Sequence, residues 1–274
     1  MPYPLAAVRS KSFAVVVPPS SLLTDLIAYW ELNEATGATR VDATGRGNDL
    51  ASNGTGGGVA QVTGVNGTGF AAGFTSGNSQ YLSRASNSDL QWGDRDRTIT
   101  GWAKFTVLDG FLITKEFSGG GNREFELNYD TGVSQLSLNV FKATDSSQIV
   151  TTDIPNLGSA ATGIWYFVAF WYNSATDTLN LQINNGGINT LAGVTSLQAA
   201  GSAIFMIGAR NYLDAFLSGT VAKVGIWNRV LTTAELTQLF NGGAPPAHPF
   251  STIPSLPVQS GIIAYQGDSL TVGS

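Results

Sequence analysis

Glu124 and Glu126 occupy alternate positions in a short apolar segment, and Asn128 takes the next alternate position. Alternate side chains of a strand point to the same face, so we expect Glu124 and Glu126 to lie side by side. Two carboxyl groups about 5–5.5 Å apart can hydrolyse a glycosidic bond, one as nucleophile and the other as acid and base. The alternative, which we favour, is a pair of ordinary solvent-facing side chains.

Oxygen ligands gather in a second segment, between residues 42 and 49, which glycines interrupt twice. Calcium takes about six to eight oxygen atoms from carboxylates, amides and carbonyls. Asp42, Asn48 and Asp49 supply such oxygens within one loop, and this predicts a calcium site. The alternative is a turn rich in Asp and Asn, whose side chains bind their own backbone.

Other segments between the expected strands carry an aromatic ring or an amide beside a charged side chain. This combination binds glycans when it is exposed on loops. The spacing does not unite the segments into one pocket, so solvated loops are the alternative for each. The candidate ligand-binding residues are Trp92, Asn122, Arg123, Asn211, Tyr212 and Asp214.

Alternating or continuous apolar runs, separated by turn residues, predict the strands that would position these side chains. The spacing of the runs is typical of a two-sheet antiparallel sandwich. One helix is predicted after Thr232, because Glu235 stands three residues later as in a capping box and Asn241 to Gly243 ends the helix. The expected strands are 26–32, 98–105, 125–129, 135–141, 165–172, 178–183, 203–207 and 219–227.

Composition supports this all-β interpretation. Only 12% of the 274 residues are charged, which disfavours a coiled coil, and 33 are glycine. The formal net charge is −5 and the basic residues form no run, so nucleic acid is not an expected partner. The absence of cysteine excludes disulfides, thiolate zinc sites and cysteine catalysis.

Proline placement marks three regions of the chain. Nine of the ten prolines stand near the two ends, and only Pro155 lies between residues 20 and 244. Because proline cannot donate to a β ladder, residues 22–243 are expected to form one sandwich domain. Residues 1–21 and 244–274 are then an extended arm and a proline-rich tail, whose apolar segments suggest docking on neighbours or a homo-oligomer. We find no signal peptide and no stretch of about 18 apolar residues, so no membrane insertion is expected.

Four segments, in order, resemble a laminin-G-like jelly roll of the concanavalin A-like lectin/glucanase superfamily. They begin at Ile27, Gln80, Trp165 and Gly219, and the last, Gly-Thr-Val-Ala-Lys-Val-Gly-Ile-Trp-Asn-Arg, is the most specific. The resemblance covers residues 22–243. It implies two face-to-face antiparallel sheets of six or seven strands.

The resemblance also bears on the candidate sites. Aromatic residues at strand centres are expected to fill the space between the sheets, here Trp30, Trp102, Phe167 and Trp227. Relatives often bind calcium, but many carry an acidic residue where this chain has Ala222. Glucanases of the superfamily carry a third carboxylate, and Asn128 stands at its place.

The tail contains Gly-Asp-Ser-Leu-Thr, which resembles the first block of a GDSL-type (SGNH) esterase and makes Ser269 the nucleophile by position. A serine nucleophile needs a base. The family's histidine lies far downstream, whereas the single histidine here is His248. These 274 residues therefore contain no complete esterase site, and Ser269 would be catalytic only in a longer chain.

These observations predict a non-catalytic module that recognises glycan or protein surfaces. A bacteriophage virion surface or attachment protein is the setting that we favour, with the terminal arms contacting virion neighbours. The alternative is an accessory carbohydrate-binding module of a longer GDSL-type esterase. Either setting predicts a virion, cell-surface or extracellular location.

Overall fold

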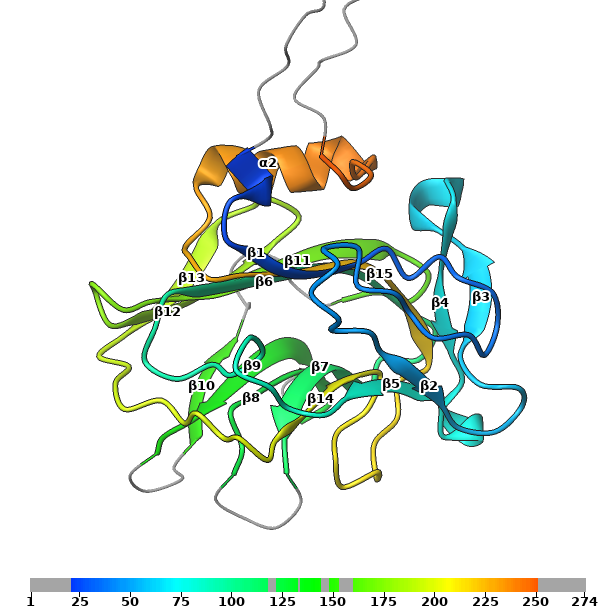
Figure 1. Cartoon of the computed structure of the whole chain (residues 1–274), viewed down its shortest axis with the longest axis horizontal. Coiled ribbons are helices and arrows are strands. Elements are labelled where there is room, and N and C mark those ends of the chain that lie inside the picture. Colours follow the sequence, from blue (N-terminus) through cyan, green and yellow to red (C-terminus); the bar gives the residue numbers. More distant parts are fainter. Residues whose placement is uncertain (1–20, 118–121, 133, 144–147, 153–159, 251–274) are drawn as a thin grey trace, which may run out of the picture.

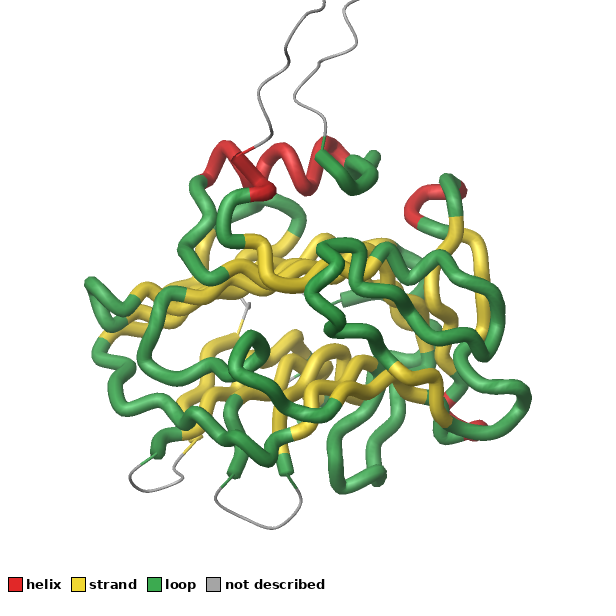
Figure 2. The backbone as a smooth tube through the Cα atoms, in the orientation of Figure 1, coloured by secondary structure: helices red, strands yellow, loops and turns green. Residues whose placement is uncertain are grey.

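The computed structural model describes residues 21–117, 122–132, 134–143, 148–152 and 160–250. They form two antiparallel sheets packed face to face, with α2 (Thr233–Phe240) lying across the outer face of one sheet (Figures 1 and 2). The predicted fold class, a two-sheet antiparallel sandwich with one short helix near the end of the domain, is confirmed. No helix in the described ranges is long and apolar enough to cross a bilayer.

The eight-stranded sheet has the order β13-β12-β11-β6-β15-β4-β3, and β1 also pairs with β15. The resemblance implied six or seven strands per sheet. The additional strand arises because the first half of β15 pairs with β4 and its second half with β1. The strands are β1 (Leu26–Trp30), β3 (Ala60–Thr63), β4 (Phe70–Phe74), β6 (Arg97–Phe105), β11 (Trp165–Asn173), β12 (Thr178–Ile183), β13 (Ile188–Ala192) and β15 (Gly219–Trp227).

The seven-stranded sheet has the order β10-β9-β8-β7-β14-β5-β2. Its strands are β2 (Ala51–Asn53), β5 (Tyr81–Arg84), β7 (Gly110–Glu116), β8 (Phe125–Asp130), β9 (Gln135–Phe141), β10 (Gln148–Thr152) and β14 (Ile204–Ile207). Short 3₁₀ turns complete the described part: η1 (Ser21–Leu23), η2 (Val65–Gly67), η3 (Ser76–Asn78) and η4 (Asn241–Gly243).

Apolar side chains are buried on both faces of the eight-stranded sheet. Along β11, Val168 and Phe170 face the space between the sheets, whereas Phe167 and Trp171 belong to a second cluster with α2. This alternation explains why nearly the whole of β11 is apolar. Two covered faces each bury the side chains that point toward them.

The second cluster corrects one prediction. Trp30 lies between the sheets as expected. Trp102, Phe167 and Trp227 are buried, but on the opposite face of the eight-stranded sheet, under α2. The prediction assumed a single core, and in this fold a helix covers a second sheet face. The indole N–H of Trp227 donates to the carbonyl of Leu22 (2.8 Å) and so fixes η1 over this cluster.

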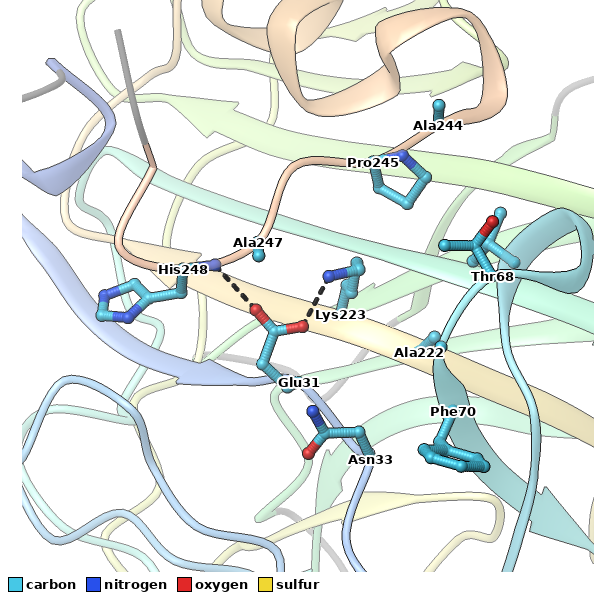
Figure 3. A pocket seen from close by; sticks show the side chains of 12 residues that line it. Glu31, Asn33, Thr68, Phe70, Ala222, Lys223, Ala244, Pro245, Ala247 and His248 are labelled. Carbon is cyan, nitrogen blue, oxygen red and sulfur yellow. Dashed lines mark hydrogen bonds and ion pairs between the residues drawn. The ribbon is translucent and has the colours of Figure 1, made fainter. Parts of the chain in front are cut away.

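The predicted capping box is present at the start of α2. The Thr232 hydroxyl accepts from the backbone N–H of Glu235, and the Glu235 carboxylate accepts from the backbone N–H of Thr232. After η4 the chain crosses the outer face of the eight-stranded sheet. There the backbone N–H of His248 donates to Glu31 (2.8 Å; Figure 3), and the ring of Phe250 meets Tyr29 edge-on. Residues 244–250, which the sequence assigns to the tail, thus pack on the sandwich.

Candidate functional site

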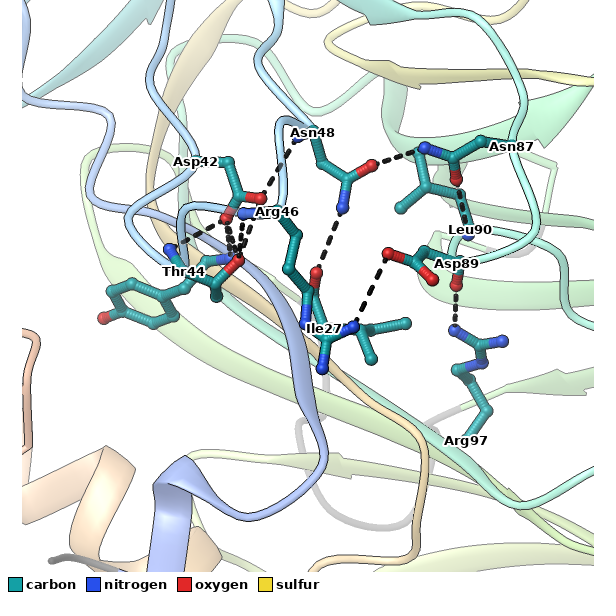
Figure 4. A network of polar contacts seen from close by, with 10 residues as sticks. Ile27, Asp42, Thr44, Arg46, Asn48, Asn87, Asp89, Leu90 and Arg97 are labelled. Atoms are coloured by element: carbon teal, nitrogen blue, oxygen red, sulfur yellow. Dashed lines mark hydrogen bonds and ion pairs between the residues drawn. The ribbon is translucent and has the colours of Figure 1, made fainter.

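The loop predicted to bind calcium is held together by its own side chains (Figure 4). The Asp42 carboxylate accepts hydrogen bonds from the backbone N–H groups of Tyr29, Thr44 and Asn48, at 3.1, 3.0 and 3.2 Å. Asp49 accepts from the backbone N–H of Asp42 at 2.8 Å. These bonds correspond to the Asp- and Asn-rich turn that the sequence left as the alternative.

Asn48 ties this loop to two other segments. Its amide N–H donates to the carbonyl of Ile27 (3.0 Å), and its amide oxygen accepts from Asn87 (2.6 Å). Asp42 and Asn48 are buried, at 3% and 0% exposure. No group of three or more His, Asp or Glu side chains placed to hold a metal ion occurs among the described residues. The three predicted ligands lie together, and their hydrogen bonds hold the loop in place.

Trp92 was predicted as a loop-borne ligand contact, and the structure places it inside. Its side chain is 1% exposed, and its ring packs against Phe125 and Phe170, with centroids 4.9 and 5.7 Å away. Its backbone N–H donates to the Glu124 carboxylate (2.7 Å). The segment folds into the end of the sandwich, so this indole stabilises the core and presents no face to solvent.

Glu124 and Glu126 do not form the side-by-side pair that strand alternation predicted. Glu124 precedes β8 and makes a fully buried ion pair with Lys115 (2.9 Å). Its carboxylate also accepts from the backbone N–H of Ala200 (2.6 Å). Burial raises the pKa of Glu124 and lowers the pKa of Lys115, and the attraction between the two charges opposes both shifts. Glu124 is therefore a structural residue.

The carboxyl group that approaches Glu126 is Glu116, on the neighbouring strand β7. Thr114 is the direct partner of Glu126, so Glu116 is its diagonal neighbour on the same face. Glu116 and Glu126 are 0% and 4% exposed. One oxygen of each accepts no hydrogen bond from a donor group of the described residues. The sequence did not identify this pair.

Burial, followed by a hydrogen bond and charge repulsion from Glu126, raises the pKa of Glu116 to about 8. A carboxyl group with a pKa of about 8 keeps its proton at neutral pH, so Glu116 is neutral there. The other Glu116 oxygen accepts from the backbone N–H of Asn211 (2.8 Å). This bond connects the pair to the loop after β14.

That loop brings together three of the predicted ligand-binding residues, Asn211, Tyr212 and Asp214. Arg210 makes a bidentate ion pair with Asp214 (2.7 and 2.6 Å). The Arg210 guanidinium lies over the rings of Phe111 and Tyr212, at 4.8 and 5.2 Å from the centroids. The Tyr212 side chain is 43% exposed. The hydrogen bond from Arg210 lowers the pKa of Asp214, which keeps this carboxylate ionised.

Asp214 also lines a pocket of about 350 Å³, which we call the rim pocket. A second carboxylate, two serine hydroxyls and two apolar side chains complete most of its wall, and none of these was predicted from the sequence. They are Ser76, Val107, Asp109, Phe216 and Ser218. In the sequence, the only hint of this pocket is the Asp109–Gly110 pair, which is typical of a turn and does not by itself indicate ligand binding.

The remaining predicted residues, Asn122 and Arg123, lie just before β8. The Arg123 guanidinium covers the ring of Phe141, 4.1 Å from its centroid. Neither residue lines the rim pocket. Ser269 lies outside the described residues.

Comparison with known proteins identifies a family with this fold. A family model described as the concanavalin A-like lectin/glucanases superfamily matches residues 75–237. Comparison with curated protein sequences gave no significant match.

Solved structures share the fold at low sequence identity. One is the binding domain of Paraclostridial Mosquitocidal Protein 1 (TM-score 0.61, 17% identity), covering 81% of this chain and 53% of that one. Another is domain 4 of AbnA, a GH43 extracellular arabinanase from Geobacillus stearothermophilus, in complex with arabinotriose (TM-score 0.58, 16% identity, 78% and 98% covered). The binding domain of botulinum neurotoxin DC in complex with rat synaptotagmin II is a third (TM-score 0.60, 15% identity, 81% and 52% covered).

The present chain spans about half the length of the two toxin structures and nearly all of the arabinanase domain. The family match extends over more than half of the present chain, from the residue after β4 to a point within α2. The protein therefore belongs to the concanavalin A-like lectin/glucanases superfamily.

Proposed function

We propose that this domain is a non-catalytic carbohydrate-binding module and that the rim pocket, with Tyr212 beside it, holds the sugar. The observation that carries the proposal is the set of groups around the pocket: two carboxylates and two hydroxyls beside apolar side chains, with an exposed aromatic ring on the adjoining loop. Such a mixture suits a saccharide, which has polar hydroxyls and apolar C–H faces. The arabinotriose bound to the similar arabinanase domain supports it.

The charged side chains around the rim pocket favour a neutral saccharide over an anionic one. Asp109 and Asp214 both line the rim pocket, and Arg210 is already neutralised by Asp214. A sialylated or sulfated ligand would meet uncompensated negative charge here. Sugar hydroxyls instead donate to the carboxylates, and such charge-assisted hydrogen bonds contribute about 1.5–3 kcal/mol each.

A glycan array followed by titration calorimetry tests this proposal. Asp214→Asn and Tyr212→Ala are expected to weaken binding of the selected glycan about tenfold or more, from the hydrogen-bond contribution above. Ile188→Ala, at a 47% exposed position on β13, is the matched control and should bind like the wild type. Undiminished binding by both rim variants would refute the assignment of the site. Cleavage of the glycan by the domain would refute the non-catalytic function.

A protein surface is the second candidate ligand, and the toxin domain bound to synaptotagmin II supports it. The exposed Tyr212 and Leu213 on the loop after β14 are suited to such a contact. A module that recognises no glycan on the array but binds a partner protein, with that binding lost in Tyr212→Ala, would favour this candidate.

We further propose a setting for this module on a bacteriophage virion or a cell surface, where apolar arms contact neighbours or a second copy of the chain. An accessory module of a longer GDSL-type esterase, with Ser269 as nucleophile, is the alternative. Ester hydrolysis by the native-length protein that Ser269→Ala abolishes would support the alternative. Arms that become ordered only on assembly would support the virion setting.

Calcium binding by Asp42, Asn48 and Asp49 is likewise a proposal. Its support is the convergence of the three side chains in one loop, of which Figure 4 shows Asp42 and Asn48. Calorimetric titration with calcium chloride tests it. Heat that disappears in Asp49→Asn, a variant that leaves the Asp42 contacts to Tyr29 and Thr44 in place, is the expected result.

A further inference from the structure

A second pocket, of about 460 Å³, lies on the outer face of the eight-stranded sheet (Figure 3). We call it the sheet pocket. Ala222 and Lys223 of β15 form part of its lining, where the pairing of β15 with β6 shifts register before Gly225. Lys223 has a φ of +50°, a conformation uncommon for a residue other than glycine. Irregularities of this kind re-aim side chains, here that of Lys223 toward the pocket.

The walls of the sheet pocket are fixed by contacts between distant segments. Lys223 donates to Glu31 at the end of β1 (2.5 Å) and to the carbonyl of Pro246 (3.2 Å). The amide of Asn66, in the η2 turn, donates to the carbonyl of Gly243 (2.7 Å). Three separate parts of the chain are therefore held around the space, and a ligand would find it already formed.

The polar groups of the sheet pocket carry no net charge. Lys223 and Glu31 form an ion pair at 18% and 20% side-chain exposure. An ammonium group has three N–H donors, and two are accounted for by Glu31 and Pro246. One Glu31 oxygen accepts a hydrogen bond from Lys223 and the other accepts one from the backbone N–H of His248, and each can accept another. A donor and an acceptor side by side are complementary to a neutral amide, whose N–H and C=O are likewise adjacent.

The apolar part of the wall is made of small side chains and one exposed ring. Ala222, Ala244, Pro245 and Ala247 leave room for a methyl group. Phe70 at the opposite wall is 55% exposed, so its ring can pack against the C–H face of a sugar. An N-acetyl group on a pyranose ring matches all three parts of the wall. Its amide fits the ion pair, its methyl group fits the space beside the small side chains, and the ring offers a C–H face to Phe70.

We propose that the sheet pocket binds an N-acetylated hexosamine, with the acetamido group against the Glu31–Lys223 ion pair and the sugar ring against Phe70. The site is separate from the rim pocket, because the two pockets share no lining residue. The inference does not depend on the function proposed for the rim pocket. The same acetamido chemistry occurs in an acetylated lysine side chain, and the experiment distinguishes the two sources.

Saturation-transfer NMR and calorimetry with N-acetylglucosamine test the proposal, with glucose as the matched ligand that lacks the acetamido group. We expect N-acetylglucosamine to bind in the millimolar range typical of a single sugar and glucose to bind at least tenfold more weakly. Phe70→Ala and Ala247→Trp, both at exposed positions, should weaken binding tenfold or more. Thermal unfolding like that of the wild type confirms that these variants fold.

Four results would overturn the proposal. They are equal binding of glucose, binding of an acetyl-lysine peptide in preference to the sugar, the absence of any binding of N-acetylglucosamine, and binding that Phe70→Ala and Ala247→Trp leave unchanged. Ile188→Ala, at a position that lines neither pocket, is the control and should bind N-acetylglucosamine like the wild type. Binding that only Tyr212→Ala weakens would instead belong to the rim pocket.

Discussion

The raised pKa of Glu116 predicts that the stability of the domain falls as the pH rises toward 8. The pKa of Glu116 is raised from 4.5 to about 8 in the folded protein, mainly by burial. Below pH 4.5 both the folded and unfolded states carry the proton, and there is no penalty. Between pH 4.5 and 8 the unfolded chain releases the proton that the folded state retains, so unfolding becomes progressively more favourable.

The size of the effect follows from this interval. About 1.4 kcal/mol for each of roughly 3.5 pH units gives a limit of about 5 kcal/mol. Relaxation and water penetration reduce such burial penalties in proteins, and we expect about 2–4 kcal/mol here. Glu116→Gln removes the titration while keeping the shape of the side chain. Its amide oxygen can still accept from Asn211, and its N–H₂ group can donate to Glu126.

Urea unfolding of the wild type and Glu116→Gln at intervals from pH 5 to pH 9 measures this difference. The two free energies of unfolding should be similar at pH 5, and the variant should be more stable by about 2–4 kcal/mol at pH 9. Asp130→Asn, at the end of the same β8 strand that carries Glu126, is the control and should follow the wild-type pH profile. Parallel pH profiles for the wild type and Glu116→Gln would show that the pKa of Glu116 is not raised in the folded protein.

Three further predictions concern stability. Lys115→Met leaves the Glu124 charge buried without its partner and should lower the free energy of unfolding in urea by about 3–5 kcal/mol. The double variant Lys115→Met/Glu124→Leu should regain much of that loss, and a mild effect of the single change would contradict the burial of the pair. Thr232→Ala removes the capping box of α2 and should lower the unfolding free energy by about 1 kcal/mol, with no loss expected from Thr232→Ser. Asp42→Ala leaves three backbone N–H groups without their acceptor and should lower the melting temperature through a loss of about 1–3 kcal/mol, and a variant as stable as the wild type would show that the loop is held by other contacts.

The main strands and the helix could be predicted from the sequence because their signals are local. Alternation identified β8 and β9, and the spacing of Thr232 and Glu235 identified the start of α2. The strand β7 was missed because polar and apolar residues do not alternate along Gly110–Glu116, so the sequence does not distinguish the two faces of this strand. Its inward Lys115 is polar, and its partner Glu124 lies on another segment.

The sites depend on long-range packing, which a single sequence does not encode in any short window. Trp92 stands in a polar, glycine-containing stretch that has the composition of a loop, and only its approach to Phe125 and Phe170 makes it part of the core. The Glu116–Glu126 pair requires the register of β7 against β8. By contrast, Asn211, Tyr212 and Asp214 are close in sequence, and their grouping on one loop followed from that proximity.

The central position of β15 has a consequence for the order in which the protein can fold during synthesis. This strand pairs with β6, β4 and β1, so it connects three parts of the eight-stranded sheet. Leu26 of β1 pairs with Trp227, about two hundred residues later in the chain. A ribosome must therefore release almost the whole domain before β1 can find its partner, and contacts of such long range form slowly. Until then the apolar strand Leu26–Trp30 lacks its β15 partner, and the nascent chain depends on protection from aggregation during that interval.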